Sequence, residues 1–221
     1  MKILVFGASG TLGVAIRTEL EDKGHKVVAA SNKSAGSDVQ TANGLEGIAS
    51  LGIKFDGCVW AQGVNANDTL LTSEKFLETL EANLFFVVKS MKYLIDANLL
   101  TQSPSLVLVS SVWQNLSRKN KFSYSVSKAA LEGLVNSVLA DFSGDGLRIN
   151  AVLPGVIDSP MTRANLSQDQ IDNIESQTPS RKLVSSCELS KIIAWLLSNE
   201  SLGVNGQFIN VDNGWSNVRT I

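Results

Sequence analysis

The sequence has few cysteines and only one histidine, so several classes of site are not expected. Cys58 and Cys187 lie far apart and without the spacing of metal ligands, so we predict no disulfide framework and no metal site. Two free thiols are typical of a reducing cytoplasm, and we expect both to be buried as small apolar groups. The lone His25 is interpreted as an exposed turn residue rather than a base or ligand.

Charge and long apolar runs are also scarce. Charged residues make up 18% of the chain, the formal net charge is -2 and no basic run occurs, which argues against nucleic acid or an anionic membrane as a partner. No apolar stretch approaches the length of a membrane span. The opening "MKILVFGASG" passes directly into a glycine turn, without the apolar segment and cleavage site of a signal peptide. We therefore predict a cytoplasmic protein.

Short apolar runs alternate with helical patterns along all 221 residues, of which 44% are hydrophobic. This is enough for one domain over 1–221 with a substantial core. Continuous apolar strands separated by helices predict a doubly wound parallel sheet, a single-domain Rossmann α/β fold. Only the nine residues 32–40, which end in the stretch "SDVQ", follow the second predicted strand. We therefore expect the crossover helix usual at that point to be missing or minimal. The predicted strands lie within 2–8, 26–31, 55–63, 105–112, 147–155 and 206–214, and the predicted helices near 12–23, 73–98, 123–142 and 187–198.

The first strand runs into the glycine-rich stretch "GASGTLG", which opens an amphipathic helix. Glycines there allow a tight turn and let backbone N–H groups approach a pyrophosphate at the helix N-terminus. Because a strand precedes it and a helix follows, a dinucleotide-binding loop is favoured over a plain structural turn. The loop residues predicted to contact the cofactor are Gly7, Ser9, Gly10, Thr11, Leu12 and Gly13.

The end of the second strand favours NADP(H) over NAD(H). The acidic residue that would hold a ribose 2′-hydroxyl is absent, and Ser31, Asn32 and Lys33 stand there instead. A hydroxyl, an amide and an ammonium suit a 2′-phosphate. The alternative is that Lys33 is only a solvated loop residue.

Tyr124 and Lys128 lie four positions apart, so a helix places both side chains on one face. A free phenol titrates near 10, and an adjacent cation is expected to lower its pKa toward the range useful for proton transfer. Ser111 lies 13 positions before Tyr124, at the end of a predicted central strand where such sheets place ligands. The alternative is a surface Tyr–Lys pair.

The sequence resembles the short-chain dehydrogenase/reductase family over essentially the whole chain. The motifs that carry the resemblance are "GASGTLG", "SS", "YSVSK", "RINAVLPGVIDSPM" and "GQFINVDNG". The resemblance implies that Tyr124 is the general acid or base and that Ser111 orients the substrate carbonyl. It implies that Lys128 holds the nicotinamide ribose and lowers the tyrosine pKa. Asn83 matches the family asparagine that supports a water-linked proton path to the lysine.

The resemblance also extends the cofactor site. It implies adenine contacts by Asp38 and Val39, nicotinamide contacts by Pro154, Gly155 and Ile157, and a carboxamide contact by Ser159. The family's N-N-A-G appears here as "WAQG", which keeps the glycine and puts local hydrogen bonds in doubt. Ala61 and Gly63 of this stretch are assigned to the cofactor site as well.

The polar segment 161–185 falls where the family covers its substrate, so we predict a covering segment at about 155–185 that closes on binding; a solvated excursion is the alternative. Trp113 is predicted to wall the substrate pocket, with core or interface packing as the alternative, and Trp215 is expected to pack in a core or interface.

The predicted activity is an NADPH-linked carbonyl reductase or alcohol dehydrogenase that acts on a small ketone, aldehyde or oxoacyl substrate. Two alternatives stay open: a non-catalytic NADP(H) sensor, and a nucleotide-sugar epimerase or dehydratase. The resemblance implies a homodimer or homotetramer through 73–98 and 123–142. The apolar series Leu131, Leu134, Val135, Val138 and Leu139 suits either a core or a partner.

Overall fold

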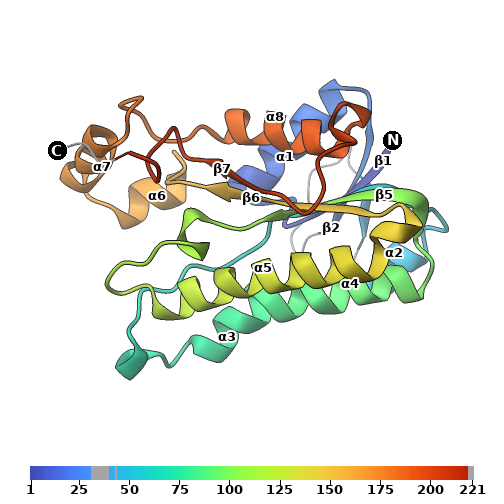
Figure 1. The fold of residues 1–221 in the computed structure, drawn as a ribbon, viewed down its shortest axis with the longest axis horizontal. Helices are drawn as coiled ribbons and strands as arrows, with labels where there is room; N and C mark the ends of the chain where they lie inside the picture. The colour runs from blue at the N-terminus through green and yellow to red at the C-terminus, as the bar shows by residue number, and fades with distance from the viewer. Residues whose placement is uncertain (31–39, 43, 219–221) are drawn as a thin grey trace.

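The fold is built on a parallel β-sheet, seen here in a computed structural model that describes residues 1–30, 40–42 and 44–218. The described residues form seven strands in the order β3-β2-β1-β4-β5-β6-β7, and every neighbouring pair is parallel. Figure 1 shows the sheet between two layers of helices. The strands are β1 Lys2–Phe6, β2 Lys26–Ala30, β3 Gln40–Ala42, β4 Phe55–Trp60, β5 Leu100–Val109, β6 Arg148–Pro154 and β7 Phe208–Val211.

The strands form where the sequence has continuous apolar runs, because both faces of the sheet are covered. In β1 and β2 the first residue is exposed and the next four are buried, and β4 is buried along nearly its whole length. The six predicted strands are all present. The seventh, β3, has only three residues, which is too short for a periodic pattern to indicate it.

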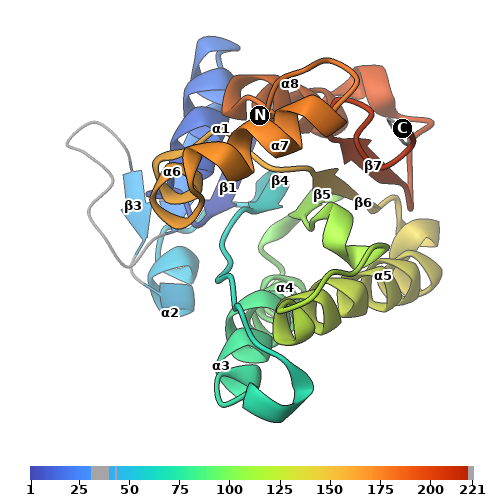
Figure 2. The same ribbon diagram turned by 90° about the vertical axis from the view of Figure 1, so that its left-hand side faces the viewer.

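The helices divide between the two faces of the sheet. Figures 1 and 2 show α1 and α8 on one face, and α4 and α5 on the other. The stretch after β2, where we expect the crossover helix to be missing or minimal, is 31–39 and lies outside the described residues. The helices are α1 Thr11–Asp22, α2 Gly44–Ala49, α3 Phe76–Leu80, α4 Phe86–Asp96, α5 Phe122–Phe142, α6 Pro160–Asn165, α7 Gln168–Gln177 and α8 Ser186–Leu197.

Each face has its own hydrophobic core. On the α4/α5 face, Leu131, Val135 and Val138 are buried against the sheet, and Leu134 and Leu139 pack against the same cluster. The apolar series of α5 therefore belongs to the core rather than to a partner surface. The prediction for cysteine is half right, since Cys58 is buried in this core and Cys187 is exposed.

The single helix predicted over 73–98 is interrupted. It consists of α3, a π-helical turn Glu81–Phe85 and α4. One extra residue in the π turn changes the direction in which the following side chains point, and such turns are frequent at functional sites. Asn83 lies in this turn and is buried.

The strand order reverses beside β1, because β2 and β3 lie on one side of it and β4 to β7 on the other. Open α/β sheets bind ligands at this point, beyond the carboxyl ends of the strands. In this protein α6 and α7 project over that end of the sheet (Figure 2). Within the described ranges, no helix is long and apolar enough to cross a bilayer.

Candidate active site

The glycine-rich loop between β1 and α1 lies at the reversal point. Gly7 has φ +74°, a left-handed conformation that side chains rarely adopt. A Cβ on Gly7 would lie 2.5 Å from the backbone nitrogen of Gln62, which follows β4. A Cβ on Gly13 would lie 2.1 Å from the carbonyl oxygen of Gly7. The two glycines therefore let the loop after β1, the first turn of α1 and the loop after β4 pack together.

The N-terminus of α1 offers backbone donors. Its cap residue is Gly10, which supplies no side-chain hydrogen bond to the first turn. Orphan N–H groups and the helix dipole at such an end favour a phosphate. Ser9, Thr11 and Leu12 border this end of the helix, with Leu12 partly buried and the other two exposed. The predicted pyrophosphate contacts are thus gathered in one place.

Ser111 and Tyr124 meet at the carboxyl end of β5. Ser111 is buried and begins a short 3-10 turn, Val112–Gln114, with its hydroxyl accepting from the backbone nitrogen of Trp113 at 3.3 Å. The hydroxyl of Ser111 lies close enough to that of Tyr124 to lower the tyrosine pKa. Tyr124 lies in the first turn of α5 and is half-buried. The structure therefore brings together two residues that the sequence separates by a strand end, a loop and a helix start.

Lys128 lies one turn further along α5 and is buried. Its Nζ donates to the carbonyl oxygen of Val109 at 2.9 Å and lies 5.7 Å from the centroid of the Tyr124 ring. Burial lowers the pKa of this ammonium to about 8, because the charged form loses its hydration.

The pKa of Tyr124 is shifted in the direction opposite to the prediction. Burial raises it above its ordinary value, and the hydroxyl of Ser111 lowers it by a smaller amount. The ammonium of Lys128 contributes no resolved part of this shift. The expectation of a phenol acidified by the lysine was wrong for this arrangement, because desolvation disfavours the phenolate more strongly than the neighbouring groups stabilise it.

Asn83 connects the π turn to the loop after β4 and to α5. Its carboxamide accepts from Val64 N at 2.8 Å, and it donates to Val64 O at 3.0 Å and to Ser127 Oγ at 2.9 Å. A Cβ on Gly63 would lie 3.1 Å from Asn83 Oδ1 and 3.6 Å from Lys128 Nζ. Asn83 and Lys128 therefore face the same narrow space beside Gly63.

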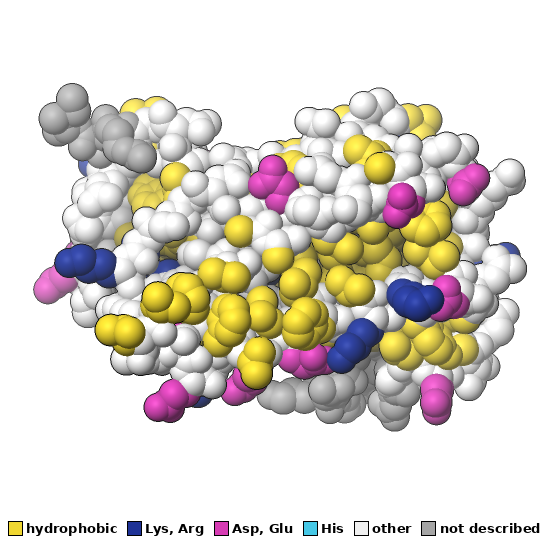
Figure 3. All heavy atoms as spheres, turned by 60° about the horizontal axis from the view of Figure 1, so that its bottom comes forward, with side chains coloured by type: hydrophobic (Ala, Val, Ile, Leu, Met, Phe, Trp, Pro, Cys, Tyr) yellow, Lys and Arg dark blue, Asp and Glu magenta, His cyan; other side chains and the backbone are white. Residues whose placement is uncertain are grey.

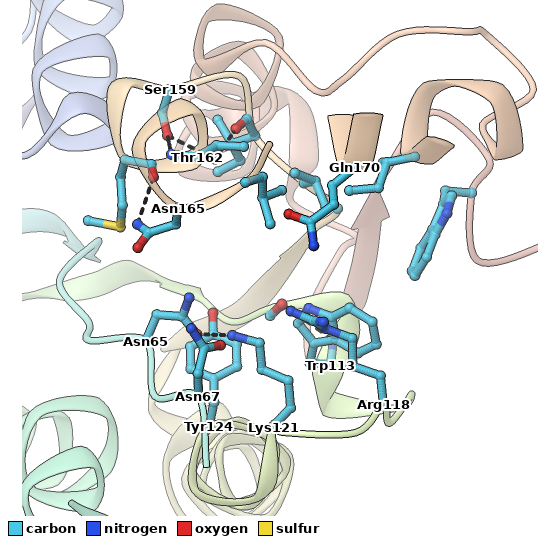
Figure 4. Close-up of a pocket in the computed structure, with 18 of the residues that line it drawn as sticks. Asn65, Asn67, Trp113, Arg118, Lys121, Tyr124, Ser159, Thr162, Asn165 and Gln170 are labelled. Carbon is cyan, nitrogen blue, oxygen red and sulfur yellow. Dashed lines mark hydrogen bonds between the residues drawn. The ribbon is translucent and has the colours of Figure 1, made fainter. Parts of the chain in front are cut away.

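Two cavities meet at Tyr124. The smaller, of about 170 Å³, brings together most residues predicted at the nicotinamide end. The larger, of about 470 Å³, extends from Ser111 and Tyr124 toward α6 and α7 and includes Ser159 in its lining. Figure 4 shows Tyr124 on one wall of the larger cavity, with Ser159 and Thr162 on the other. The smaller cavity includes Ala61, Gly63, Ser111, Tyr124, Lys128, Pro154, Gly155 and Ile157.

A matching family model covers residues 35–216 and is described as enoyl-(acyl carrier protein) reductase. It spans most of the chain, including Ser111, Tyr124 and Lys128. The chain belongs to the short-chain dehydrogenase/reductase family. It is an oxidoreductase of this family, whose members use NAD(P)(H).

Curated relatives of this family align over almost the full chain. The 3-oxoacyl-(acyl-carrier-protein) reductase of Escherichia coli K12 is 28% identical, covering 96% of this chain and 95% of its own. Carbonyl reductase family member 4 of Danio rerio is 29% identical and covers 96% of both chains.

Solved structures confirm the fold. The ligand-free aldohexose dehydrogenase of Thermoplasma acidophilum superposes with a TM-score of 0.89 at 24% identity, covering 100% of this chain and 95% of its own. A short-chain dehydrogenase family protein of Francisella tularensis gives 0.87 at 22% identity, with 97% and 98% coverage.

The family departure "WAQG" has a structural replacement. Trp60 stacks on Phe6, with ring centroids 5.4 Å apart, and its Nε1 donates to Ser90 Oγ at 2.8 Å. The local support of the sheet is thus provided by an aromatic pair and a buried hydrogen bond.

Gln62 is a site residue that the sequence reasoning missed. It lines the smaller cavity, and both polar atoms of its side chain are buried without a hydrogen-bond partner in the part of the chain that the structure describes. Buried polar groups usually have partners, so these two atoms fit a polar ligand in that cavity. The family motif could have indicated Gln62 by its position alone. The orphaned carboxamide and the glycine cradle at Gly7 and Gly13 both suit a dinucleotide.

Five predicted cofactor contacts lie outside the described residues, which leaves the choice between NADP and NAD to experiment. They are Ser31, Asn32, Lys33, Asp38 and Val39.

The predicted covering segment 155–185 contains α6 and α7, with Ser159 and Ser167 capping their N-termini through their side chains. The cavity lining includes Met161, Gln170 and Ile174 from this segment. Trp113 and Trp215 also line the cavity and pack edge to face, with ring centroids 5.6 Å apart. Both tryptophans therefore contribute to a pocket wall.

Proposed function

We propose that this protein is an NADPH-linked carbonyl reductase, or an alcohol dehydrogenase in the reverse direction, for a small ketone, aldehyde or oxoacyl compound. The observation that carries the proposal is the meeting of Ser111, Tyr124 and Lys128 at the junction of two cavities. The larger cavity has the volume of a small-molecule site. The smaller one adjoins the glycine loop through Gln62.

In the proposed reduction, Tyr124 donates its proton to the carbonyl oxygen, and Ser111 donates a hydrogen bond that orients the same oxygen. A phenol whose pKa is raised by burial keeps its proton at neutral pH, so it is present in the donor form. The bound nicotinamide supplies the hydride. The protein holds the carbonyl and manages the proton.

After Tyr124 has given up its proton, Lys128 and Asn83 return a proton to it in the proposed mechanism. The ammonium is buried with a pKa of about 8, so it gives up a proton more readily than an exposed lysine does. Asn83 faces the same space beside Gly63 and supports a water-linked path to the lysine. In addition, Lys128 is assigned a hydrogen bond to the nicotinamide ribose.

The remaining cofactor assignments follow the sequence. Backbone N–H groups at Gly10 and the first turn of α1 hold the pyrophosphate, Asp38 and Val39 hold the adenine, and Lys33 holds a ribose 2′-phosphate. Pro154, Gly155, Ile157 and Ser159 hold the nicotinamide. Gln62 adds a hydrogen bond from its side chain, which has no partner among the described residues.

The proposed organisation is a single domain over 1–221, with a covering segment at 155–185, in a cytoplasmic homodimer or homotetramer. Figure 3 shows hydrophobic side chains gathered on the face that carries α4 and α5. Leu77, Phe85, Val88 and Val126 are large apolar residues exposed on α3, the π turn, α4 and α5. Such residues favour an interface between copies of the chain.

The assay follows the absorbance of NADPH, and in parallel NADH, over a panel of ketones, aldehydes and oxoacyl thioesters. Tyr124→Phe should lower kcat by roughly 10²–10⁴-fold while NADPH binding, followed by fluorescence, stays within about threefold of the wild type. Tyr93→Phe is the matched control, because Tyr93 packs against the core away from both cavities. It should retain activity.

Two results would decide against the proposal. Full activity of Tyr124→Phe would remove the assigned acid. NADPH binding by the wild type without turnover of any carbonyl compound would favour a cofactor-sensing protein instead.

A further inference from the structure

The larger cavity has an uneven charge. Among the described residues that line it there are two cations, Arg118 and Lys121, and no carboxylate. Figure 4 shows both cations on the wall that carries Tyr124, facing the covering segment across the cavity. The proposed proton transfer uses neither of them.

Lys121 is buried in the cavity wall, with 4% of its surface exposed, although lysine is rarely buried without a charged partner. Its Nζ donates to Asn65 Oδ1 and to the carbonyl oxygen of Ala66, the latter at 3.4 Å, and lies 5.3 Å from the centroid of the Tyr124 ring. Both hydrogen-bond partners are neutral. In the part of the chain that the structure describes, Lys121 forms no ion pair. A buried cation is costly unless an anion accompanies it.

Arg118 adds a second positive charge to the same wall. Its guanidinium lies 5.6 Å from the centroid of the Trp113 ring and is close enough to Lys121 that its charge lowers the lysine pKa. Asp68 acts in the opposite direction on that pKa, but less strongly. The carboxylate of Asp68 already accepts hydrogen bonds from the backbone nitrogen and the hydroxyl of Ser123. Two neighbouring cations, with no free carboxylate beside them among the described residues of the cavity lining, suit an anion from outside the chain.

Helix α7 keeps its own negative charge out of the cavity. Gln170, Asn173 and Gln177 line the cavity at intervals of three and four residues, which is one face of a helix. The acidic residues of α7, at positions 169, 172 and 175, are not part of the lining. The wall opposite the cations therefore offers carboxamides, which donate hydrogen bonds to an anion without repelling it.

We propose that the substrate is a small oxo acid whose carboxylate is bound by Arg118 and Lys121 while its carbonyl oxygen is held at Tyr124 and Ser111. This inference rests on the proposed reductase function and specifies its substrate class. Because Lys121 lies against the ring of Tyr124, the carboxylate is only a few bonds from the carbonyl carbon. The fork of Arg118 suits two-point recognition of a carboxylate.

The test compares acetoacetate and levulinate with their methyl esters, which keep the carbonyl but lack the charge. A single hydrogen bond to a charged group is worth roughly 10–100-fold in affinity, so kcat/KM for the better acid should exceed that of its ester by at least roughly 10–100-fold. Turnover is followed by NADPH absorbance. Stabilisation of the NADPH complex by each compound is followed by thermal unfolding, which does not depend on turnover.

Arg118→Gln is the first variant, because Arg118 is exposed and its replacement removes no buried side chain. Lys121→Met is the second. Each should reduce the acid-to-ester ratio of kcat/KM by about tenfold or more. Lys119→Met removes a neighbouring exposed charge that does not line the cavity, so it should leave this ratio unchanged.

The outcomes separate the two proposals. Turnover with no preference for the acid, or equal losses on acid and ester in Arg118→Gln, would overturn the oxo acid proposal and leave the reductase standing. Absence of turnover with these compounds and with the wider panel of ketones, aldehydes and oxoacyl thioesters would overturn the reductase. In that case, stabilisation by the acids alone, lost in Arg118→Gln, would still support the anion site, and no difference between acid and ester would refute it.

Discussion

Asp68 holds the N-terminus of the helix that carries the proposed catalytic residues, although it lies in a loop more than fifty positions earlier. Its carboxylate accepts from Ser123 N at 2.9 Å and from Ser123 Oγ, and its backbone oxygen accepts from Phe122 N at 3.2 Å. The helix has no cap from its own flanking residue, Lys121. Asp68 therefore supplies the side-chain cap of α5 from a distance.

Replacing Asp68 by Ala should destabilise the protein by about 3 kcal/mol. Ser123 is fully buried, so the change leaves a backbone donor and a hydroxyl without a partner, at about 1–3 kcal/mol each. It also removes a negative charge from the helix N-terminus, which contributes roughly 0.3–1 kcal/mol. For a chain of this length, that loss corresponds to a fall in Tm of roughly 6–12 °C. Asp68→Asn keeps one acceptor and should lose about half as much.

The assay is urea unfolding followed by circular dichroism, with Asp96→Ala as the control. Asp96 pairs with Lys92 on the surface, and both side chains are more than half exposed, so its loss should change stability by less than about 1 kcal/mol. If Asp68→Ala were as stable as Asp96→Ala, the capping role would be wrong. Because Tyr124 follows Ser123 directly, we also expect Asp68→Ala to lower kcat.

Two further predictions concern the glycine loop and the buried lysine. Gly13→Ala should abolish NADPH binding, because its Cβ would lie 2.1 Å from the backbone oxygen of Gly7. The control Gly133→Ala has open space around its Cβ on α5, so it should bind NADPH normally and gain roughly 0.5–1 kcal/mol of stability. Wild-type NADPH affinity in Gly13→Ala, measured by NADPH fluorescence, would contradict this prediction. Above pH of about 8 the unfolded chain retains a proton on Lys128 that the folded protein has lost, so the stability of the wild type relative to Lys128→Met should rise with pH, by up to about 3 kcal/mol as pH approaches 10.5. Urea unfolding of both proteins between pH of about 7.5 and about 10 measures this difference, and a constant value would show that the lysine is not desolvated.

The sequence by itself determined the fold class and the proposed catalytic residues. Both are encoded in short-range patterns, since apolar runs form buried strands, glycines mark the loop that follows β1, and a four-residue interval places Tyr124 and Lys128 on one helix face. The motifs also indicated the family, which the family model then confirmed. The strand β3 was missed because three residues carry no periodicity.

Tertiary structure decided everything that depends on distant residues meeting. Burial is one example: the pKa of Tyr124 rises because its surroundings desolvate it, and no spacing between residues encodes that environment. The unpartnered side chain of Gln62, the cap that Asp68 places on α5 and the convergence of Arg118 and Lys121 depend on loops that follow different strands. Local sequence fixes which elements form, whereas the electrostatics of the site follow from what those elements exclude from water.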